Sequence, residues 1–303
     1  MSTPDRAPAA QPAMAPRATP YTGRLRRLTG HWGPAALIVL GLLGIWESYV
    51  RLWAVPKWLL PAPSVIAMTL IGSRALLLDH TLVTLLEVVV GFGLSLLCGV
   101  LLACGIATSQ TLERALYPFV IASQMVPIIV IAPLLLIWVG YGLTPKIIVV
   151  ALTAFFPIVV NMVDGLKSAD PDAVNLLRTM GASRWQLFVK VQVPTSLPFL
   201  FSGLRVAMAV SVIGAVIGEW VGSSQGLGYL MIRSKPQFLT ERVFAAIVVL
   251  SVMGVALFVL VGVIEKRAIP WWHNEQRQRS LSQEECICPS THTDVPCCGA
   301  CSC

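Results

Sequence analysis

Charged side chains are scarce in this sequence: only 12% of its 303 residues are Asp, Glu, Lys or Arg, whereas 56% are hydrophobic. The mean hydropathy is +0.76, which is too apolar for an ordinary soluble domain. The shortage of charge therefore excludes that class and indicates a protein of the lipid bilayer.

Familiar enzyme motifs are also missing. The sequence contains no G-x-x-x-x-G-K-[ST] phosphate-binding loop and no H-E-x-x-H metal-binding pair, and its four histidines are scattered. We therefore expect no catalytic residues and no metal or cofactor bound by this chain. A membrane enzyme such as an intramembrane protease or lipid transferase is disfavoured for the same reason.

Long apolar runs are what the sequence does contain. A membrane-spanning helix needs about 20 mostly apolar residues, and six runs meet that need: 34–54, 82–107, 117–139, 146–165, 198–219 and 243–265. The sequence thus predicts an all-α membrane protein with one six-span bundle over residues 34–268. Residues 1–33 lack the apolar core of a secretory signal, so we expect a disordered basic tail there and a second disordered tail over residues 269–303.

The basic residues predict how the bundle is oriented. If the N-terminus is cytoplasmic, 15 Lys and Arg residues face the cytoplasm and seven face outward. Cytoplasmic loops normally carry the excess, so both termini and the loop over 166–197 should be cytoplasmic. The net charge of +7 then reflects topology and attraction to the membrane surface, and nucleic acid is a poorer explanation.

One polar segment between two spans, residues 170–194, reads "DPDAVNLLRTMGASRWQLFVKVQVP". Asp170 followed by Pro171 is typical of a helix start, and Gly181 should end that helix in a backbone conformation that glycine tolerates. Ser183 can then cap a second amphipathic helix, and Pro194 should prevent its smooth continuation into the next span. Two interpretations fit this pattern: a helix pair lying in the lipid headgroups, or a docking element for a soluble partner.

The same segment resembles the cytoplasmic coupling loop of ATP-binding-cassette (ABC) importer permeases, whose pattern is Glu-Ala-Ala, three residues, Gly, nine residues, Ile, one residue, Leu-Pro. Gly181 and Pro194 stand at the required separation, and Val191 and Val193 replace the Ile and Leu. Asn, Leu and Leu at 175–177 replace Glu-Ala-Ala, so the role of the usual Glu does not carry over.

The resemblance extends over residues 35–268. "LLPAPSVI", "FFPIVVNMVDGLKSADPD" and "SGLRVAMAVSVIGAVIGEWVGSSQGLGYLM" are similar to the nitrate, sulfonate and taurine branch of these permeases. "ASQMVPIIVIAPLLLIWVGYGLTPK" and "VIGAVIGEWVG" are similar to permeases for thiamine-pyrimidine precursors or riboflavin.

This resemblance implies the type I importer permease fold in a bacterial inner membrane. It also implies two copies of a separate ATPase subunit that binds ATP and Mg, a second permease copy, and a periplasmic or lipid-anchored solute-binding protein. The residues expected to couple to the ATPase are Asn175, Arg178, Gly181, Ala182, Arg184, Trp185, Phe188 and Pro194. The alternative function is an ion-coupled secondary carrier that uses intramembrane Glu residues, and the coupling-loop resemblance argues against it.

Polar residues inside spans are costly and often face a cavity or a partner. On that ground the candidates for the solute path are Glu87, Gln124, Asn161 and Glu219. Each also has a purely structural interpretation as helix–helix packing or an interfacial side chain. Glu47 lies four residues before Arg51, a spacing that predicts an ion pair, and the segment 223–238 is predicted as a surface loop rather than a gate helix.

Six of the eight cysteines fall in residues 286–303, together with His292. Thiols and imidazole suit Zn or Cu(I), but the spacing matches no regular zinc module, and cytoplasmic thiols stay reduced. We therefore expect that truncation after Asn274 leaves assembly and transport near normal. The check is solute uptake at matched membrane levels of protein, and a loss of uptake at those levels would assign the tail a role.

Overall fold

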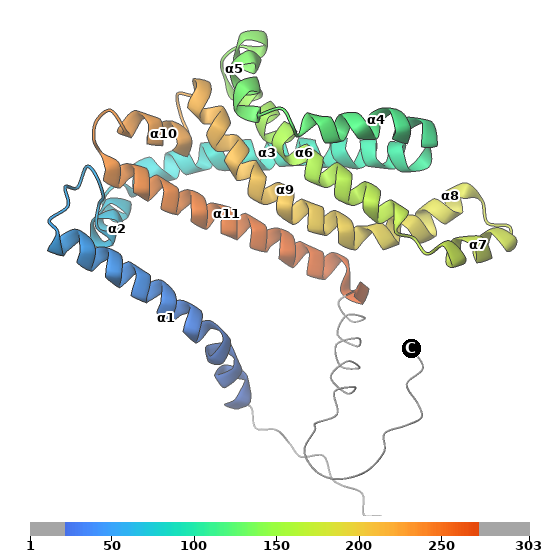
Figure 1. Ribbon diagram of the computed structural model, residues 1–303, viewed down its shortest axis with the longest axis horizontal. Helices are drawn as coiled ribbons and strands as arrows, with labels where there is room; N and C mark the ends of the chain where they lie inside the picture. Colours follow the sequence, from blue (N-terminus) through green and yellow to red (C-terminus); the bar gives the residue numbers. More distant parts are fainter. Residues whose placement is uncertain (1–21, 273–303) are drawn as a thin grey trace, which may run out of the picture. The chain divides into compact units, whose positions relative to one another are not determined.

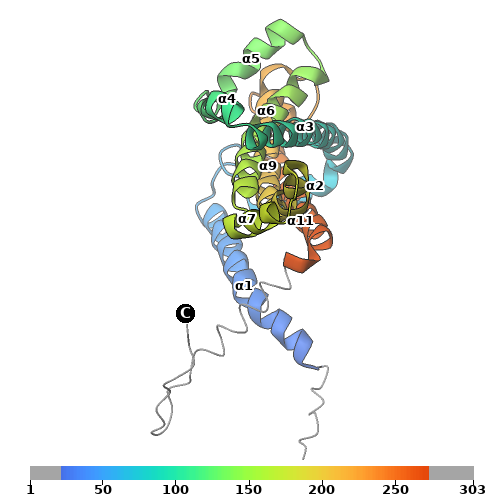
Figure 2. The ribbon, with the colours of Figure 1, turned by 90° about the vertical axis from the view of Figure 1, so that its right-hand side faces the viewer.

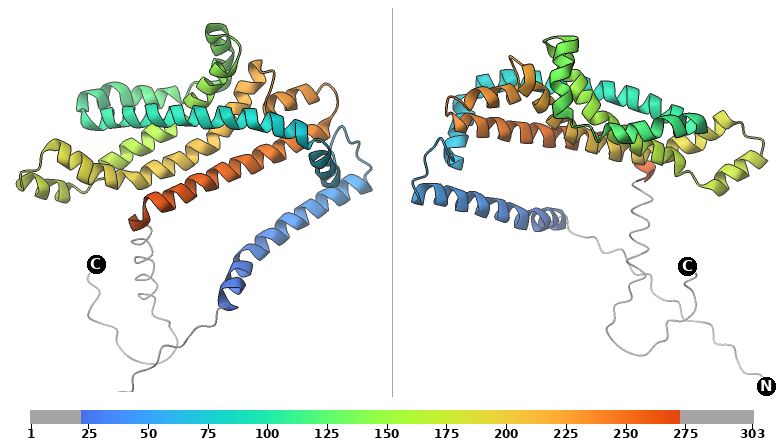
Figure 3. Two further views of the ribbon diagram at one scale, coloured as in Figure 1. Left: turned by 180° about the vertical axis from the view of Figure 1, so that it is seen from behind. Right: turned by 45° about the horizontal axis from the view of Figure 1, so that its top comes forward.

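The computed structural model describes residues 22–272, with side chains from residue 37 onward, and helices make up the regular structure in that range. The chain divides into two units, Met1–Ser64 and Val65–Cys303. The tails beyond the described range include most of the residues predicted as disordered and the whole cysteine-rich segment. Figures 1 and 3 show the helices in order along the chain.

The first unit contains α1 (Thr22–Leu52), and α2 (Pro63–Gly72) begins at its end. The helices of the second unit are α3 (Arg74–Thr108), α4 (Gln110–Ser123), α5 (Ile128–Val139), α6 (Leu143–Lys167), α7 (Pro171–Thr179), α8 (Arg184–Leu187), the π-helix η1 (Phe188–Gln192), α9 (Val193–Gly222), α10 (Leu227–Ser234) and α11 (Thr240–Ala268).

Within the first unit, Glu47 has a structural role. Its carboxylate lies 2.6 Å from Arg51 Nε, which confirms the predicted ion pair. The same carboxylate accepts hydrogen bonds from the backbone N–H of Ser64 at 3.1 Å and from its hydroxyl at 2.8 Å. Because Ser64 lies in the first turn of α2, Glu47 satisfies a backbone donor that has no partner inside that helix. The helix α1 itself begins at Thr22, before the predicted start of the first span at residue 34.

The core of the second unit is α6, which packs against α3 on one side and α9 on the other (Figures 1 and 2). Buried apolar side chains follow α6 along its length, among them Val150, Ala154, Ile158 and Val163. Small residues on the neighbouring helices allow a close approach, as is common between helices in membranes. At Gly203 of α9 an added Cβ would lie 2.7 Å from Asn161 Cβ and 2.8 Å from the Pro157 carbonyl oxygen.

The third predicted span, 117–139, is not one straight helix. It is split into α4 and α5, whose axes differ by 99°, and Figure 2 shows α5 turning away from α4. The break lies at Gln124–Pro127. Pro127 has no N–H and disfavours the helical conformation of the residue before it, which explains why α4 cannot continue.

The described residues support fewer spans than the six predicted. Four helices in the described range are long and apolar enough to cross a membrane, and the number rises to five if the bent pair counts as one span. The four are α3, α6, the continuous stretch Arg184–Gly222 and α11. The protein is thus an all-helical membrane protein, but six spans are not established by its structure.

Pro194 also behaves differently from the prediction. The chain stays helical from Arg184 to Gly222, because η1 joins α8 to α9. Val193 N–H donates to the Phe188 carbonyl across this π-turn. Pro194 then lies at the start of α9, directly after the π-turn. The second amphipathic helix is consequently continuous with a span.

The contact at Gly203 generates a testable prediction. Gly203→Ala should lower stability by about 1 to 3 kcal/mol, because the added methyl overlaps backbone and Cβ atoms of α6 that cannot rotate away. Thermal unfolding of the purified protein in detergent measures the change. Gly93→Ala in α3 is the matched control, since its Cβ would meet nothing within 4 Å. Equal melting temperatures for the two variants would contradict the close packing of α6 and α9.

Candidate functional site

The first candidate site is the loop between α6 and α9, which folds as its sequence predicts. Asp170 caps α7 by accepting from Asp172 N–H at 2.9 Å, and Pro171 is the first helical residue. Gly181 follows α7 with φ of +83°, a left-handed conformation that glycine adopts without steric cost. Ser183 and Gln186 form a reciprocal capping box at α8.

The loop presents apolar side chains on its surface. Trp185 is 71% exposed and Met180 is 75% exposed, although both are large and apolar. The Trp185 ring stacks on Phe188 with centroids 5.9 Å apart. A cavity of about 320 Å³ lies between α7 and α8 and is lined in part by Gly181 and Ala182. Among the predicted coupling residues, Asn175, Arg178, Gly181, Arg184 and Trp185 are exposed, and Ala182, Phe188 and Pro194 are half-buried.

The second candidate site lies at the opposite end of the bundle, where α6 begins and α9 ends (Figure 1). Lys146, in the first turn of α6, donates to Glu87 of α3 at 2.8 Å and to the hydroxyl of Ser223 at 2.7 Å. Glu87 is completely buried, and the Lys146 side chain is only 7% exposed. Three separate segments of the chain are therefore joined at one ammonium group.

Glu219 of α9 lies in the same buried region and binds the start of α10. Its carboxylate accepts from the Thr84 hydroxyl at 2.6 Å and from Gly228 N–H at 2.5 Å. Thr84 in turn accepts from Leu227 N–H at 3.0 Å, and His80 Nδ1 accepts from Gly226 N–H at 3.0 Å. The prediction of a surface loop over 223–238 is thus wrong in part. Residues 227–234 form a helix, and side chains of α3 and α9 accept hydrogen bonds from the N–H groups at its start.

The cluster holds more acidic than basic side chains. Two carboxyl groups, those of Glu87 and Glu219, are buried beside one ammonium, that of Lys146. Within the described residues, Glu87 Oε2 has no hydrogen-bond partner. Lys146 can therefore neutralise only one of the two acidic groups.

The structure brings together two of the four residues predicted for the solute path. Glu87 and Glu219 belong to the buried cluster, and Glu87 has the cation that the local sequence did not supply. Gln124 is exposed at the end of α4, beside the break before α5. Asn161 donates to the Pro157 carbonyl within α6 and contacts α9 at Gly203, as a packing residue does.

Sequence reasoning missed Lys146 as a member of this site. The signal that could have found it is positional: Lys146 begins a span at the same predicted membrane face as Glu87 and Glu219. A lysine there would face either the headgroups or the interior, and two buried carboxylates favour the interior. No comparable feature of the sequence points to Thr84 and His80 as members of this site.

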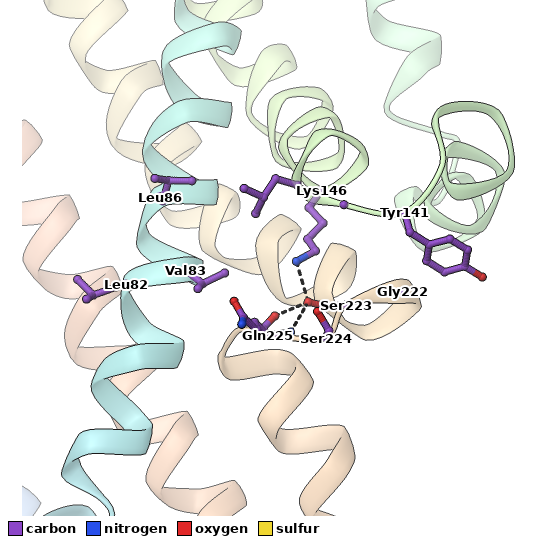
Figure 4. Close-up of a pocket in the computed structure, with 11 residues that line it drawn as sticks. Leu82, Val83, Leu86, Tyr141, Lys146, Gly222, Ser223, Ser224 and Gln225 are labelled. Carbon is purple, nitrogen blue, oxygen red and sulfur yellow. Dashed lines mark hydrogen bonds between the residues drawn. The ribbon is translucent and has the colours of Figure 1, made fainter.

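A pocket of about 800 Å³ opens beside the cluster, and Lys146 lines it. Figure 4 shows Leu82, Val83 and Leu86 along α3, with Ser223, Ser224 and Gln225 near the lysine. The Tyr141 ring points away from Lys146 in this view. The pocket thus has one apolar wall and one hydroxyl- and amide-bearing wall.

Comparison with solved structures shows which class of protein has this fold. The fold is similar to a chain of the methionine ABC transporter MetNI in an inward-facing conformation, with a TM-score of 0.58 and 19% identity over 65% of this chain and 97% of that one. This similarity supports the fold alone, which is that of an ABC importer permease.

The sequence comparisons then give the family. Residues 95–270 match the family described as binding-protein-dependent transport system inner membrane component. The chain is 41% identical to the formylaminopyrimidine transport permease protein ThiX of Halalkalibacterium halodurans, over 78% of this chain and 94% of that one. It is 36% identical to the riboflavin transport system permease protein RibX of Chloroflexus aurantiacus, over 84% and 96% respectively.

The chain therefore belongs to the family of binding-protein-dependent transport system inner membrane components. It is a multi-pass permease subunit of an ABC transporter, and ATP is hydrolysed by a separate protein. Its partners accordingly include an ATPase and a binding protein. This membership replaces the alternative of an ion-coupled secondary carrier.

The buried ion pair generates a prediction for stability. Lys146→Met leaves two buried carboxylates without a cation and should cost about 3 to 5 kcal/mol, since breaking a buried pair strands its partner. The double variant Lys146→Met with Glu87→Gln should recover part of that loss, because both charges are removed together. Unfolding of the purified protein in detergent provides the four values of the cycle.

Lys167→Met serves as the control for that cycle. Lys167 pairs with Glu113 at 2.7 Å, but both side chains are more than a third exposed, so the loss should be about 1 kcal/mol or less. If the double variant at Lys146 and Glu87 were as unstable as the sum of its single variants, the two residues would not be coupled.

Proposed function

We propose that two copies of this chain form the translocation path of an importer for a small solute, driven by two ATPase subunits and supplied by an external binding protein. The solute is of the formylaminopyrimidine or riboflavin kind, or of the nitrate, sulfonate and taurine kind that the sequence also resembles. The observation that carries the proposal is the α7–Gly181–α8 loop, which ends the two central helices with an exposed apolar surface. Trp185 and Met180 are the side chains that suit an apolar groove on the ATPase.

The continuity of α8 with α9 supports a mechanical role for the loop. Because Arg184–Gly222 is one helical stretch, a displacement of α8 is transmitted along α9 rather than absorbed in a flexible linker. The other end of that stretch carries Glu219, beside the Lys146 cluster and the pocket. Movement at the ATPase therefore reaches the opposite end of the path, as alternating access by rigid-body motion requires.

The remaining predictions fit this proposal. The basic residues favour a cytoplasmic loop and cytoplasmic termini, and a six-span permease needs α1 as its first span and the bent α4–α5 pair as its third. Glu87 and Glu219 remain candidates for the path because Glu87 is bonded to Lys146, which lines the pocket, whereas Gln124 and Asn161 remain predictions from the sequence alone. Substituted-cysteine labelling of Asn175 and Gln225 tests the orientation, because the two should react from opposite sides of the membrane.

Gly181 supplies the functional test. Gly181→Val should leave membrane levels normal but weaken retention of the ATPase or uncouple hydrolysis from uptake. A β-branched residue at φ of +83° is strained, by about 1 to 2 kcal/mol, and relief of that strain tilts α8. An added Cβ would meet nothing within 4 Å, so the effect comes from the backbone and not from a clash.

Gly181→Asn is the matched control, because asparagine tolerates the left-handed conformation. It should retain the ATPase and transport much better than Gly181→Val. Co-purification in mild detergent and uptake in reconstituted vesicles are the measurements. Wild-type coupling in the valine variant would favour a helix pair that merely lies in the headgroups.

A further inference from the structure

The pocket at the Lys146 end of the bundle has the size and lining of a small-molecule site. Its volume of about 800 Å³ falls within the range of about 300 to 1,000 Å³ usual for such sites. Three apolar residues of α3, Leu82, Val83 and Leu86, line one side of the pocket (Figure 4). A flat ring could lie against that wall with its polar edge toward the other side.

The opposite wall offers hydrogen bonds without net charge. The exposed hydroxyl of Ser224 and the exposed amide of Gln225 lie there, next to Ser223. Ser223 holds this segment in shape by accepting from Gln225 N–H at 3.1 Å and donating to the Gln225 carbonyl. Because those bonds use the main chain of Gln225, its amide side chain is left to contact a solute.

The charges behind the pocket decide which solutes it suits. Among the described residues, Lys146 is the only basic one that lines it, and its ammonium is already paired with Glu87 at 2.8 Å. Glu219, one helical turn before Ser223, is a second buried acidic side chain. Because the Lys146 ammonium is already neutralised by Glu87, it offers no unpaired positive charge that would attract an anion into the pocket.

We infer that this pocket is a solute-binding subsite of the permease, and that it takes uncharged heterocycles with hydrogen-bonding edges in preference to anions such as sulfonates. The inference deepens the proposed function, on which it rests, by choosing between the two solute classes that the sequence resembles. It places part of the solute selection in the permease itself, in addition to any selection by the binding protein. Gln225 is the specificity-determining residue at its rim.

The test is equilibrium binding to the purified full-length chain in lipid nanodiscs, without ATPase or binding protein. The probes are formylaminopyrimidine and riboflavin, which are uncharged at neutral pH, and ethanesulfonate, which is an anion. The wild-type chain should bind at least one uncharged probe about tenfold more tightly than ethanesulfonate. Equal or tighter binding of ethanesulfonate, or no binding of any probe, overturns the inference.

Two variants at one position then test the electrostatic cause. Gln225→Arg adds a cation at the rim and should raise the affinity for ethanesulfonate, relative to the uncharged probe, by about fivefold. Gln225→Glu should change the same ratio by about the same factor in the opposite direction. Because Gln225 is exposed, neither variant buries a new charge.

Gln110→Arg and Gln110→Glu are the matched controls. Gln110 is also an exposed glutamine, but it begins α4, after the far end of α3 from Leu82 and Leu86. These variants should leave the ratio unchanged, and an equal response at both positions would mean that net charge, not the pocket, sets the preference. If the chain failed to retain an ATPase but bound the probes with the expected preference, the proposed function would be contradicted and the preference of the pocket would not.

Discussion

The close packing of α6 between α3 and α9 is the constraint on which both candidate sites depend. Lipid tails are as apolar as leucine side chains, so apolar burial alone does not hold helices together in a bilayer, and close contact between them matters more. At Gly203 the backbones approach so closely that a methyl group would overlap Asn161 and the Pro157 carbonyl. Because α6 and α9 are fixed along their length, the loop at one end and the polar cluster at the other have defined positions.

The polar cluster uses a different kind of interaction from the core. At the α10 end, Thr84, His80 and Glu219 accept hydrogen bonds from the first N–H groups of a short helix, where no intrahelical acceptor exists. In a low-dielectric region such bonds are strong when complete and costly when broken. The cluster therefore helps to fix α10 on α3 and α9, together with the buried side chains of Leu227, Leu230 and Met231.

The sequence predicted local features well and interactions between distant segments poorly. Asp170, Gly181 and Ser183 were placed correctly because capping and left-handed backbone depend on residue type within one or two turns. Pro194 was misjudged because a proline that ends one helix can equally begin another, and a π-turn can join the two. The break in the third predicted span has a local cause at Pro127, but its angle of 99° depends on packing and is not encoded locally.

The partner of Glu87 illustrates the same limit. Lys146 is 59 residues away, and only the packing of α6 on α3 brings the two together. Hydropathy placed both residues near one membrane face, but nothing in the sequence paired them. The charge of a solute pocket then depends on which acidic residues that packing places behind it, so the chemical preference of the path is a property of the fold and cannot be read from any single span. The helical stretch Arg184–Gly222 joins the loop after α7 to the segment beside that pocket, where Ser223 accepts a hydrogen bond from Lys146.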